Sequence, residues 1–146
     1  AGAFESLRLE KGYRSLGTDI HTNYNPYESG LGFTVKLKKD DDFIGKNALQ
    51  KIKEKPIEKR LTCMIIDDPE GMALGTEPIY SNGKAVGYVT STNYGYFVDK
   101  HIVYGYLPTE LSEKGNKLEV EYFGKRYPLT VTEEPLLDPE NNRLKS

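Results

Sequence analysis

The spacing of apolar residues changes character near Pro56. Ahead of that residue apolar side chains recur at the spacing of short helices, and after it they occur in short, closely spaced runs typical of strands. The segment from Phe4 to Lys11 carries Phe4 and Leu7 three positions apart and is followed by Gly12, a residue suited to a helix C-terminus. We therefore predict a short helix there. Its start at the first residues suggests that the sequence begins inside a longer polypeptide.

The remainder of this first part is less regular. Residues 17–32 are rich in Gly, Asn, Pro and Tyr without a sustained period, which predicts an ordered loop, and residues 33–38 alternate as a strand does. A second helix is predicted over residues 43–53, because the carboxylates of residues 40–42 precede it and lysines end it. The simpler interpretation of that acidic run is a solvated helix start, since a metal site would need converging ligands from elsewhere.

Short strands with turns between them dominate the second part. Asn82-Gly83 suits the left-handed positions of a tight hairpin, and Gly124 lies at the tip of another, so consecutive strands should pair antiparallel. This spacing predicts a small barrel or sandwich. The predicted strands are Arg60 to Ile66, Glu77 to Tyr80, Ala85 to Ser91, Ile102 to Leu107, Leu118 to Phe123 and Tyr127 to Thr132.

These elements predict a fold class that is mainly β with short helices, or α+β. The best domain limit lies near residue 56, with an antiparallel domain over residues 57–137 and a polar surface tail over residues 138–146.

Composition narrows the classes of partner. The chain has 20 Lys and Arg against 22 Asp and Glu, a formal charge of -2, with both signs interspersed. No broad basic field is available for nucleic acid or anionic lipid. No apolar run approaches the roughly 20 residues of a membrane span, and the first residues do not resemble a signal peptide. We expect a soluble protein with no nucleic-acid or membrane partner.

A single cysteine, Cys63, lies in the apolar run from Leu61 to Ile66. An internal disulfide is impossible, and a reducing compartment is the simpler assumption. The apolar setting favours a buried structural thiol over a nucleophile.

Few residues could form a self-contained active site. His21 and His101 are the only histidines, and no CxxC, HExxH or GxSxG motif occurs, so metal-dependent hydrolysis and triad chemistry lack their minimum parts. Gly30-Leu31-Gly32 precedes a predicted strand and lacks a third glycine, which argues against a dinucleotide site. We therefore predict no catalytic residue and no metal ligand.

Two groups of residues leave alternatives open. The tyrosines within residues 90–97 could stack on a flat heterocycle or pack as half-buried strand residues, and packing is favoured. Arg8, Glu10, Asp19 and Glu28 could polarise a substrate. The favoured interpretation is that they tie the first helix to the following loop through ion pairs.

Several short segments occur along the chain in a distinctive order. They are residues 6–13 (SLRLEKGY), 17–20 (GTDI), 25–31 (NPYESGL), 42–49 (DFIGKNAL), 87–91 (GYVTS), 103–108 (VYGYLP) and 134–136 (EPL). This order resembles the T-protein, or aminomethyltransferase, of the glycine cleavage system. It resembles the C-terminal half of dimethylglycine and sarcosine dehydrogenases more closely, and the resemblance covers nearly the whole chain.

The resemblance implies a three-domain module whose central cleft binds tetrahydrofolate and whose C-terminal antiparallel barrel closes one side. Residues 1–56 would be the end of the folate-binding domain. Tyr13 matches an aromatic residue that touches folate in the family, and Arg143 matches an arginine near the C-terminus. Phe4 departs from the pattern, because T-proteins carry an arginine there and an apolar side chain cannot pair with a folate carboxylate. The family's aspartate near the reacting folate nitrogen and its pterin-binding glutamate would lie upstream.

The resemblance therefore predicts the C-terminal fragment of a tetrahydrofolate-dependent one-carbon transfer module, inactive alone. The longer protein would be an FAD-dependent dimethylglycine or sarcosine dehydrogenase or oxidase, and its upstream folate-binding and flavin domains would be this fragment's partners. The alternatives are a stand-alone aminomethyltransferase and a non-catalytic barrel that binds a partner. The implied compartment is the bacterial cytoplasm or the mitochondrial matrix.

Overall fold

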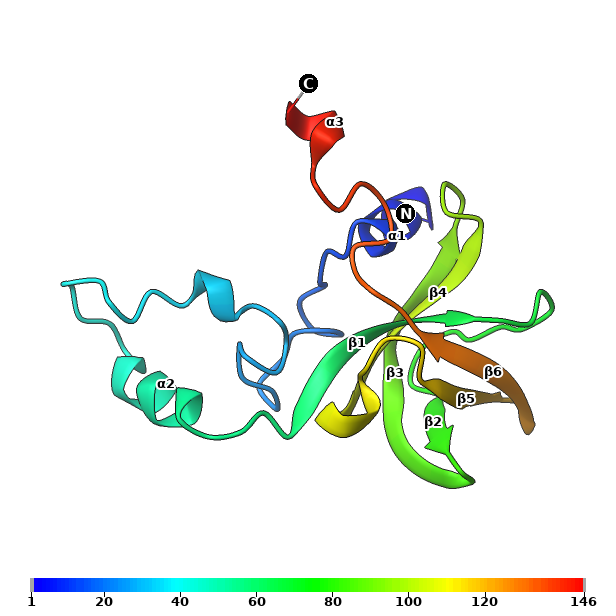
Figure 1. Cartoon of the computed structure of the whole chain (residues 1–146), viewed down its shortest axis with the longest axis horizontal. Coiled ribbons are helices and arrows are strands. Elements are labelled where there is room, and N and C mark those ends of the chain that lie inside the picture. The colour runs from blue at the N-terminus through cyan, green and yellow to red at the C-terminus, as the bar shows by residue number, and fades with distance from the viewer. Residues whose placement is uncertain (1, 146) are drawn as a thin grey trace.

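The short runs predicted as strands after Pro56 form six antiparallel strands in the computed structural model, which describes residues 2–145. They pair in the order β1-β4-β3-β2-β5-β6 and close into a barrel (Figure 1). The predicted antiparallel barrel is confirmed, and the sandwich alternative is wrong. The strands are β1 (Lys59–Ile66), β2 (Pro78–Ser81), β3 (Lys84–Gly95), β4 (Lys100–Pro108), β5 (Lys117–Tyr122) and β6 (Lys125–Val131).

Both predicted hairpin turns occur. Asn82, with φ 51°, and Gly83, with φ 78°, join β2 to β3. Phe123, with φ 47°, and Gly124, with φ 75°, join β5 to β6. Two successive positive φ angles match the twist of the strands they connect.

The barrel interior is filled by aliphatic side chains, because inward positions alternate with outward ones along each strand. Its buried members are Met64, Ile66, Ala73, Ile79, Val89, Val103, Leu107, Leu118, Val120, Leu129 and Val131. A second buried cluster lies on the outside of β1 and β4 and consists of Leu9, Leu61, Cys63, Ile102, Tyr104 and Tyr106. Strand β4 is therefore buried on both faces.

Strand β4 also approaches β3 unusually closely at Gly105. A Cβ atom added to Gly105 would lie 2.5 Å from the carbonyl oxygen of Tyr88. The pairing of β3 with β4 is irregular between Val89 and Ser91. Only glycine leaves room for this approach of two backbones.

The outer cluster is covered by the first helix, α1 (Gly2–Glu10), which packs on β3 (Figure 1). The hydroxyl of Ser6 donates a hydrogen bond of 2.6 Å to the carbonyl oxygen of Tyr94. The second helix, α2 (Lys46–Lys53), begins later than predicted, because the left-handed Gly45 precedes it. Three short helical segments complete the described elements: η1 (Gly32–Thr34), η2 (Thr109–Leu111) and α3 (Asn142–Lys145).

The strand predicted over residues 33–38 is wrong. Residues 32–34 form η1, and none of residues 33–38 belongs to a strand. An alternating run becomes a strand only if its backbone groups find a partner strand. This run lies outside the barrel, where none pairs with it.

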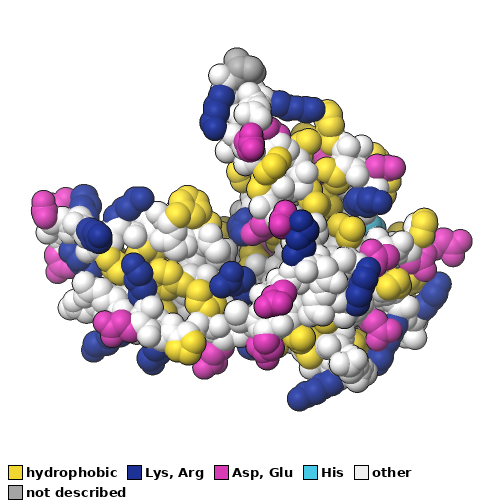
Figure 2. Space-filling model, viewed as in Figure 1, with side chains coloured by type: hydrophobic (Ala, Val, Ile, Leu, Met, Phe, Trp, Pro, Cys, Tyr) yellow, Lys and Arg dark blue, Asp and Glu magenta, His cyan; other side chains and the backbone are white. Residues whose placement is uncertain are grey.

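The run belongs to an arm, defined here as residues 32–56, that extends away from the barrel (Figure 1). No residue of the arm is buried. Helix α2 is so short that it would be only marginally stable in water as an isolated helix. Figure 2 shows hydrophobic side chains at its surface among lysines. Within residues 2–145, no helix is long and apolar enough to cross a membrane. The domain limit near residue 56 remains a prediction.

Candidate functional site

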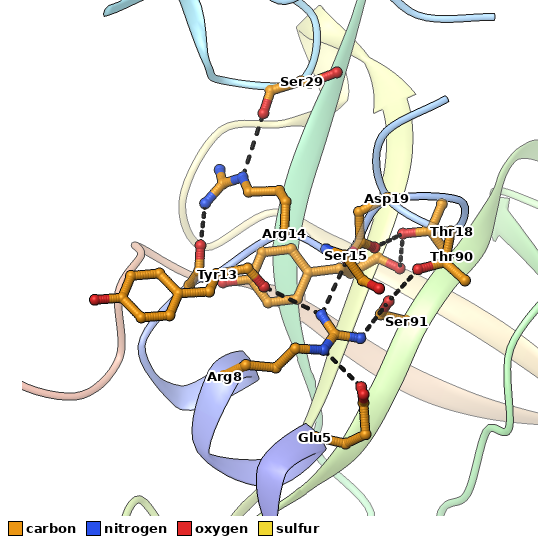
Figure 3. Close-up of polar contacts among 12 residues, drawn as sticks. Glu5, Arg8, Tyr13, Arg14, Ser15, Thr18, Asp19, Ser29, Thr90 and Ser91 are labelled. Atoms are coloured by element: carbon orange, nitrogen blue, oxygen red, sulfur yellow. Dashed lines mark hydrogen bonds and ion pairs between the residues drawn. The ribbon is translucent and has the colours of Figure 1, made fainter. Parts of the chain in front are cut away.

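A buried ion pair connects α1, the following loop and the barrel. The Arg8 guanidinium lies 3.0 Å from a carboxylate oxygen of Asp19, and the two side chains are 8% and 2% exposed. Its Nη2 donates to the Ser91 hydroxyl of β3 at 2.9 Å, and its Nε donates to Glu5 at 2.6 Å (Figure 3). The guanidinium thus has acceptors on several sides, as a buried charge requires.

Both carboxylate oxygens of Asp19 also accept hydrogen bonds. Its Oδ1 accepts a hydrogen bond from the Thr90 hydroxyl at 2.6 Å, and its Oδ2 accepts one from the backbone N–H of Ser15 at 2.9 Å. These bonds hold the carboxylate in place against β3 (Figure 3). A polarising role for Arg8 or Asp19 toward a substrate is not supported, because both face one another and the protein.

The loop after Asp19 is anchored to β4 through Tyr106. The Tyr106 hydroxyl donates to the carbonyl oxygen of Asp19 at 2.8 Å and lies 2.8 Å from the Ser29 hydroxyl. Its ring stacks on Tyr24 with centroids 3.4 Å apart. Burial raises the pKa of Tyr106, so the neutral, donating form persists at physiological pH. The loop is therefore ordered, as predicted.

Tyr13 lies on the other side of this network. Its carbonyl oxygen accepts from Arg8 at 3.1 Å, while its side chain is 59% exposed and points away from the ion pair (Figure 3). The ring borders a hollow of about 620 Å³. The hollow is lined by Lys11, Gly12, Tyr13, Arg14, Ile20, Leu31, Phe33, Pro135, Pro139 and Asn141. A flat ligand could stack on Tyr13 without rearrangement of the core.

The cations beside this hollow already have partners. Lys11 Nζ lies 3.6 Å from an Asp138 carboxylate oxygen, and Arg14 pairs with Glu134. Arg143, the other predicted ligand residue, lies on α3 with its guanidinium carbon 5.1 Å from the centre of the Phe97 ring. Arg143 is two positions from Asn141, which lines the hollow, but is not itself a lining residue. Of the two predicted ligand residues, Tyr13 therefore lines this hollow and Arg143 does not.

The prediction that ion pairs tie α1 to the following loop is only partly confirmed for Arg8, Glu10, Asp19 and Glu28. Arg8 and Asp19 form the predicted ion pair. Glu28 instead accepts bonds from Asn25 within the loop, at 2.7 and 2.9 Å. Glu10 accepts from backbone N–H groups of the β3–β4 turn, not from the loop that follows α1. Sequence reasoning missed Thr90 and Ser91 as partners, because they lie more than 70 positions away along the chain.

Cys63 is 2% exposed, and burial raises the pKa of its thiol to about 12. The predicted burial of Cys63 is therefore confirmed, and the raised pKa favours the protonated thiol at neutral pH. Of the tyrosines within residues 90–97, the packing prediction is wrong for Tyr96, whose side chain is 77% exposed. Among residues 2–145, no three His, Cys, Asp or Glu side chains are placed to hold a metal ion.

Comparisons with known families match the two parts of the chain separately. The model of the glycine cleavage T-protein C-terminal barrel domain matches residues 59–138, and that of the GCVT N-terminal domain matches residues 1–39. The chain belongs to the glycine cleavage T-protein family. It is homologous to the C-terminal part of dimethylglycine and sarcosine dehydrogenases and of aminomethyltransferases.

The sequence identity and the coverage of three relatives show how far this similarity extends. Human mitochondrial dimethylglycine dehydrogenase is 44% identical over 144 residues, which are 97% of this chain and 17% of that protein. An aminomethyltransferase of Prochlorococcus marinus is 36% identical over 92% of this chain and 36% of its own length. The aminomethyltransferase T of the glycine cleavage system from Bartonella henselae has a solved structure that superposes with a TM-score of 0.83 at 26% identity, over 94% of this chain and 38% of that one. The chain thus spans well under half of each relative.

Proposed function

We propose that this chain is the C-terminal part of a tetrahydrofolate-dependent one-carbon transfer module in a longer protein. The observation that carries the proposal is the match over 97% of the chain to the dimethylglycine dehydrogenase family at 44% identity. The chain supplies the barrel, α1 and one wall of the folate cleft. The folate-binding residues of that wall are Tyr13 and Arg143.

The residues beside Tyr13 fit one portion of a folate. An exposed tyrosine ring at the edge of an apolar hollow is a suitable wall for a flat pterin or aminobenzoyl ring. The carboxylate tail needs a cation, and Lys11 and Arg14 are engaged by Asp138 and Glu134. Arg143 is the proposed anion partner, although its guanidinium lies against the Phe97 ring in this structure. Bound tetrahydrofolate would supply the acceptor nitrogen for the one-carbon unit.

The longer protein is proposed to be an FAD-dependent dimethylglycine- or sarcosine-type dehydrogenase or oxidase. Its flavin domain and the remainder of its folate-binding domain precede residue 1, and its compartment is the bacterial cytoplasm or the mitochondrial matrix. Support comes from relatives named dimethylglycine dehydrogenase and 4-methylaminobutanoate oxidase, which match over 97% and 98% of this chain. A stand-alone aminomethyltransferase is the second candidate, because Prochlorococcus aminomethyltransferases also match.

The test is the change Tyr13→Ala in the longer protein, with the dissociation constant for tetrahydrofolate measured by titration calorimetry. Loss of ring stacking is expected to weaken binding about tenfold, equivalent to roughly 1.4 kcal/mol. The melting temperature should change little, because the side chain is more than half exposed. Phe123→Ala, at the β5–β6 turn, removes an even more exposed ring that does not line the hollow and serves as the control. Wild-type folate affinity in Tyr13→Ala would remove Tyr13 from the site.

A further inference from the structure

A second hollow lies between α1 and the turn that joins β3 to β4. Its volume is about 510 Å³, and it is separate from the hollow beside Tyr13, with which it shares no lining residue. The lining residues are Gly2, Ala3, Ser6, Leu7, Glu10, Asn93, Tyr96 and Phe97. It combines a carboxylate, an amide and two aromatic rings.

The carboxylate of Glu10 is the unusual component. Glu10 is fully buried, and its Oε1 accepts from the backbone N–H groups of Phe97 at 2.6 Å and Val98 at 3.1 Å. Among the described residues, its Oε2 has no hydrogen-bond partner. A buried carboxylate oxygen without a donor is costly, and a donor that carries a positive charge offsets the cost best.

The aromatic walls have the complementary property. Tyr96 is 77% exposed and Phe97 63% exposed at the rim, and their rings offer faces that attract cations. Phe97 already holds one guanidinium, that of Arg143, 5.1 Å from its ring centre. A planar guanidinium suits such walls better than a compact ammonium does, because it can stack and donate at once.

We propose that this hollow receives an arginine side chain from polypeptide that precedes residue 1 in the longer protein. The guanidinium donates to Glu10 Oε2 while its flat face lies against Tyr96. The proposal rests on the proposed function only in requiring that a longer protein exists. It concerns a contact between domains, separate from the folate site.

The source of the arginine follows from the position of the hollow. Gly2 and Ala3 form part of the lining, so a chain leading into α1 would pass beside it. The N-terminal domain model of the family matches this chain only over residues 1–39, and the relatives continue far beyond the length matched here. A segment tethered so close has a high effective concentration at the hollow, which makes even a weak contact populated.

A matched pair of probes tests the chemistry on the 146-residue chain. Nα-acetyl-arginine amide and Nα-acetyl-citrulline amide have the same shape, but only the first is charged. We expect the arginine probe to shift the backbone amide NMR signals of Phe97 and Val98, and the citrulline probe to bind at least about tenfold more weakly. Glu10→Gln keeps an acceptor for both amides and should abolish the preference for arginine. Tyr96→Ala, a surface change that does not threaten folding, should weaken binding of the arginine probe.

The origin of the arginine side chain is tested in the longer protein. There the hollow should already be filled, so the arginine probe should not shift the amide NMR signals of Phe97 and Val98. Equal binding of both probes, a charge preference retained in Glu10→Gln, or undiminished probe binding by the longer protein would each overturn the inference. Normal folate binding by that same protein would show that the proposed function survives this failure.

Discussion

At the residue scale, the pair formed by Arg8 and Asp19 helps to hold α1 on the barrel. Both side chains are buried, and their partners come from α1, from the loop and from β3. Each additional donor or acceptor lowers the cost of keeping two charges out of water. Removing one partner leaves the other charge buried and only partly satisfied.

We therefore expect Arg8→Met to lower the free energy of unfolding by about 3 kcal/mol in denaturant titrations, because the Asp19 carboxylate loses its cation. The double change Arg8→Met with Asp19→Asn should recover part of that loss. Lys114→Met, which breaks the exposed ion pair with Glu133, is the control and should have no resolvable effect. An equally small effect for Arg8→Met would mean that the buried pair contributes no stability.

At the element scale, the hairpin of β2 and β3 depends on its turn. Asn82 and Gly83 both have positive φ angles, and a Cβ atom at Gly83 would meet no neighbouring atom. Any effect of a side chain at Gly83 therefore reports the backbone conformation and not a clash. Substitutions at position 83 therefore test the backbone conformation of the turn.

Gly83→Val should destabilise the chain by roughly 1–2 kcal/mol, because a β-branched residue is strained in the left-handed region. Gly83→Asn should cost clearly less, since asparagine tolerates that region. Thermal unfolding followed by circular dichroism compares the two. Equal melting temperatures for Val and Asn would contradict a turn with positive φ at this position.

At the scale of the whole molecule, the chain consists of a closed barrel with uncovered apolar residues outside it. Phe4, Leu7, Leu16 and Phe33 are all more than half exposed, and they fall within the part matched by the N-terminal domain model. Surfaces of this kind indicate contacts with further protein. They agree with the proposal that this chain completes a larger module.

The isolated chain is accordingly expected neither to oxidise N-methylglycines nor to form methylenetetrahydrofolate. In the proposed function, the flavin and the family's upstream carboxylates belong to preceding domains, so the isolated chain lacks the groups for both steps. Product formation with dimethylglycine and tetrahydrofolate, followed by mass spectrometry, is the measurement, and the longer protein under the same conditions is the positive control. Turnover by the isolated chain would show that its own residues suffice.

The gene that encodes the longer protein tests the choice between dehydrogenase and stand-alone aminomethyltransferase. A flavin dinucleotide needs a strand, a Gly-rich turn and a helix N-terminus for its phosphates, and we expect these upstream as a Gly-x-Gly-x-x-Gly segment after an early strand. The resemblance to T-proteins implies an arginine at the position of Phe4, and that predicted departure favours this outcome. A reading frame too short for such a domain would instead favour the aminomethyltransferase.

The sequence by itself determined the features that depend on neighbouring residues. Strand-forming composition and the close spacing of turns identified all six barrel strands, and Asn82-Gly83 and Phe123-Gly124 identified hairpin turns, because strand propensity and positive φ angles are largely local properties. The order of short segments likewise indicated the family. Whether Tyr13 and Arg143 contact folate is still a prediction.

Only the tertiary structure decided which residues meet across long separations. The run at residues 33–38 alternates like a strand but has no strand beside it, and Tyr106 is buried against Asp19 while Tyr96 is exposed. Tyr106 and Asp19 lie 87 positions apart, a pairing that no local pattern encodes. Likewise Glu10 appeared to be an ion-pair partner for the nearby loop, yet its carboxylate binds the distant β3–β4 turn. Burial and pairing depend on the closed barrel, which exists only once all six strands have assembled.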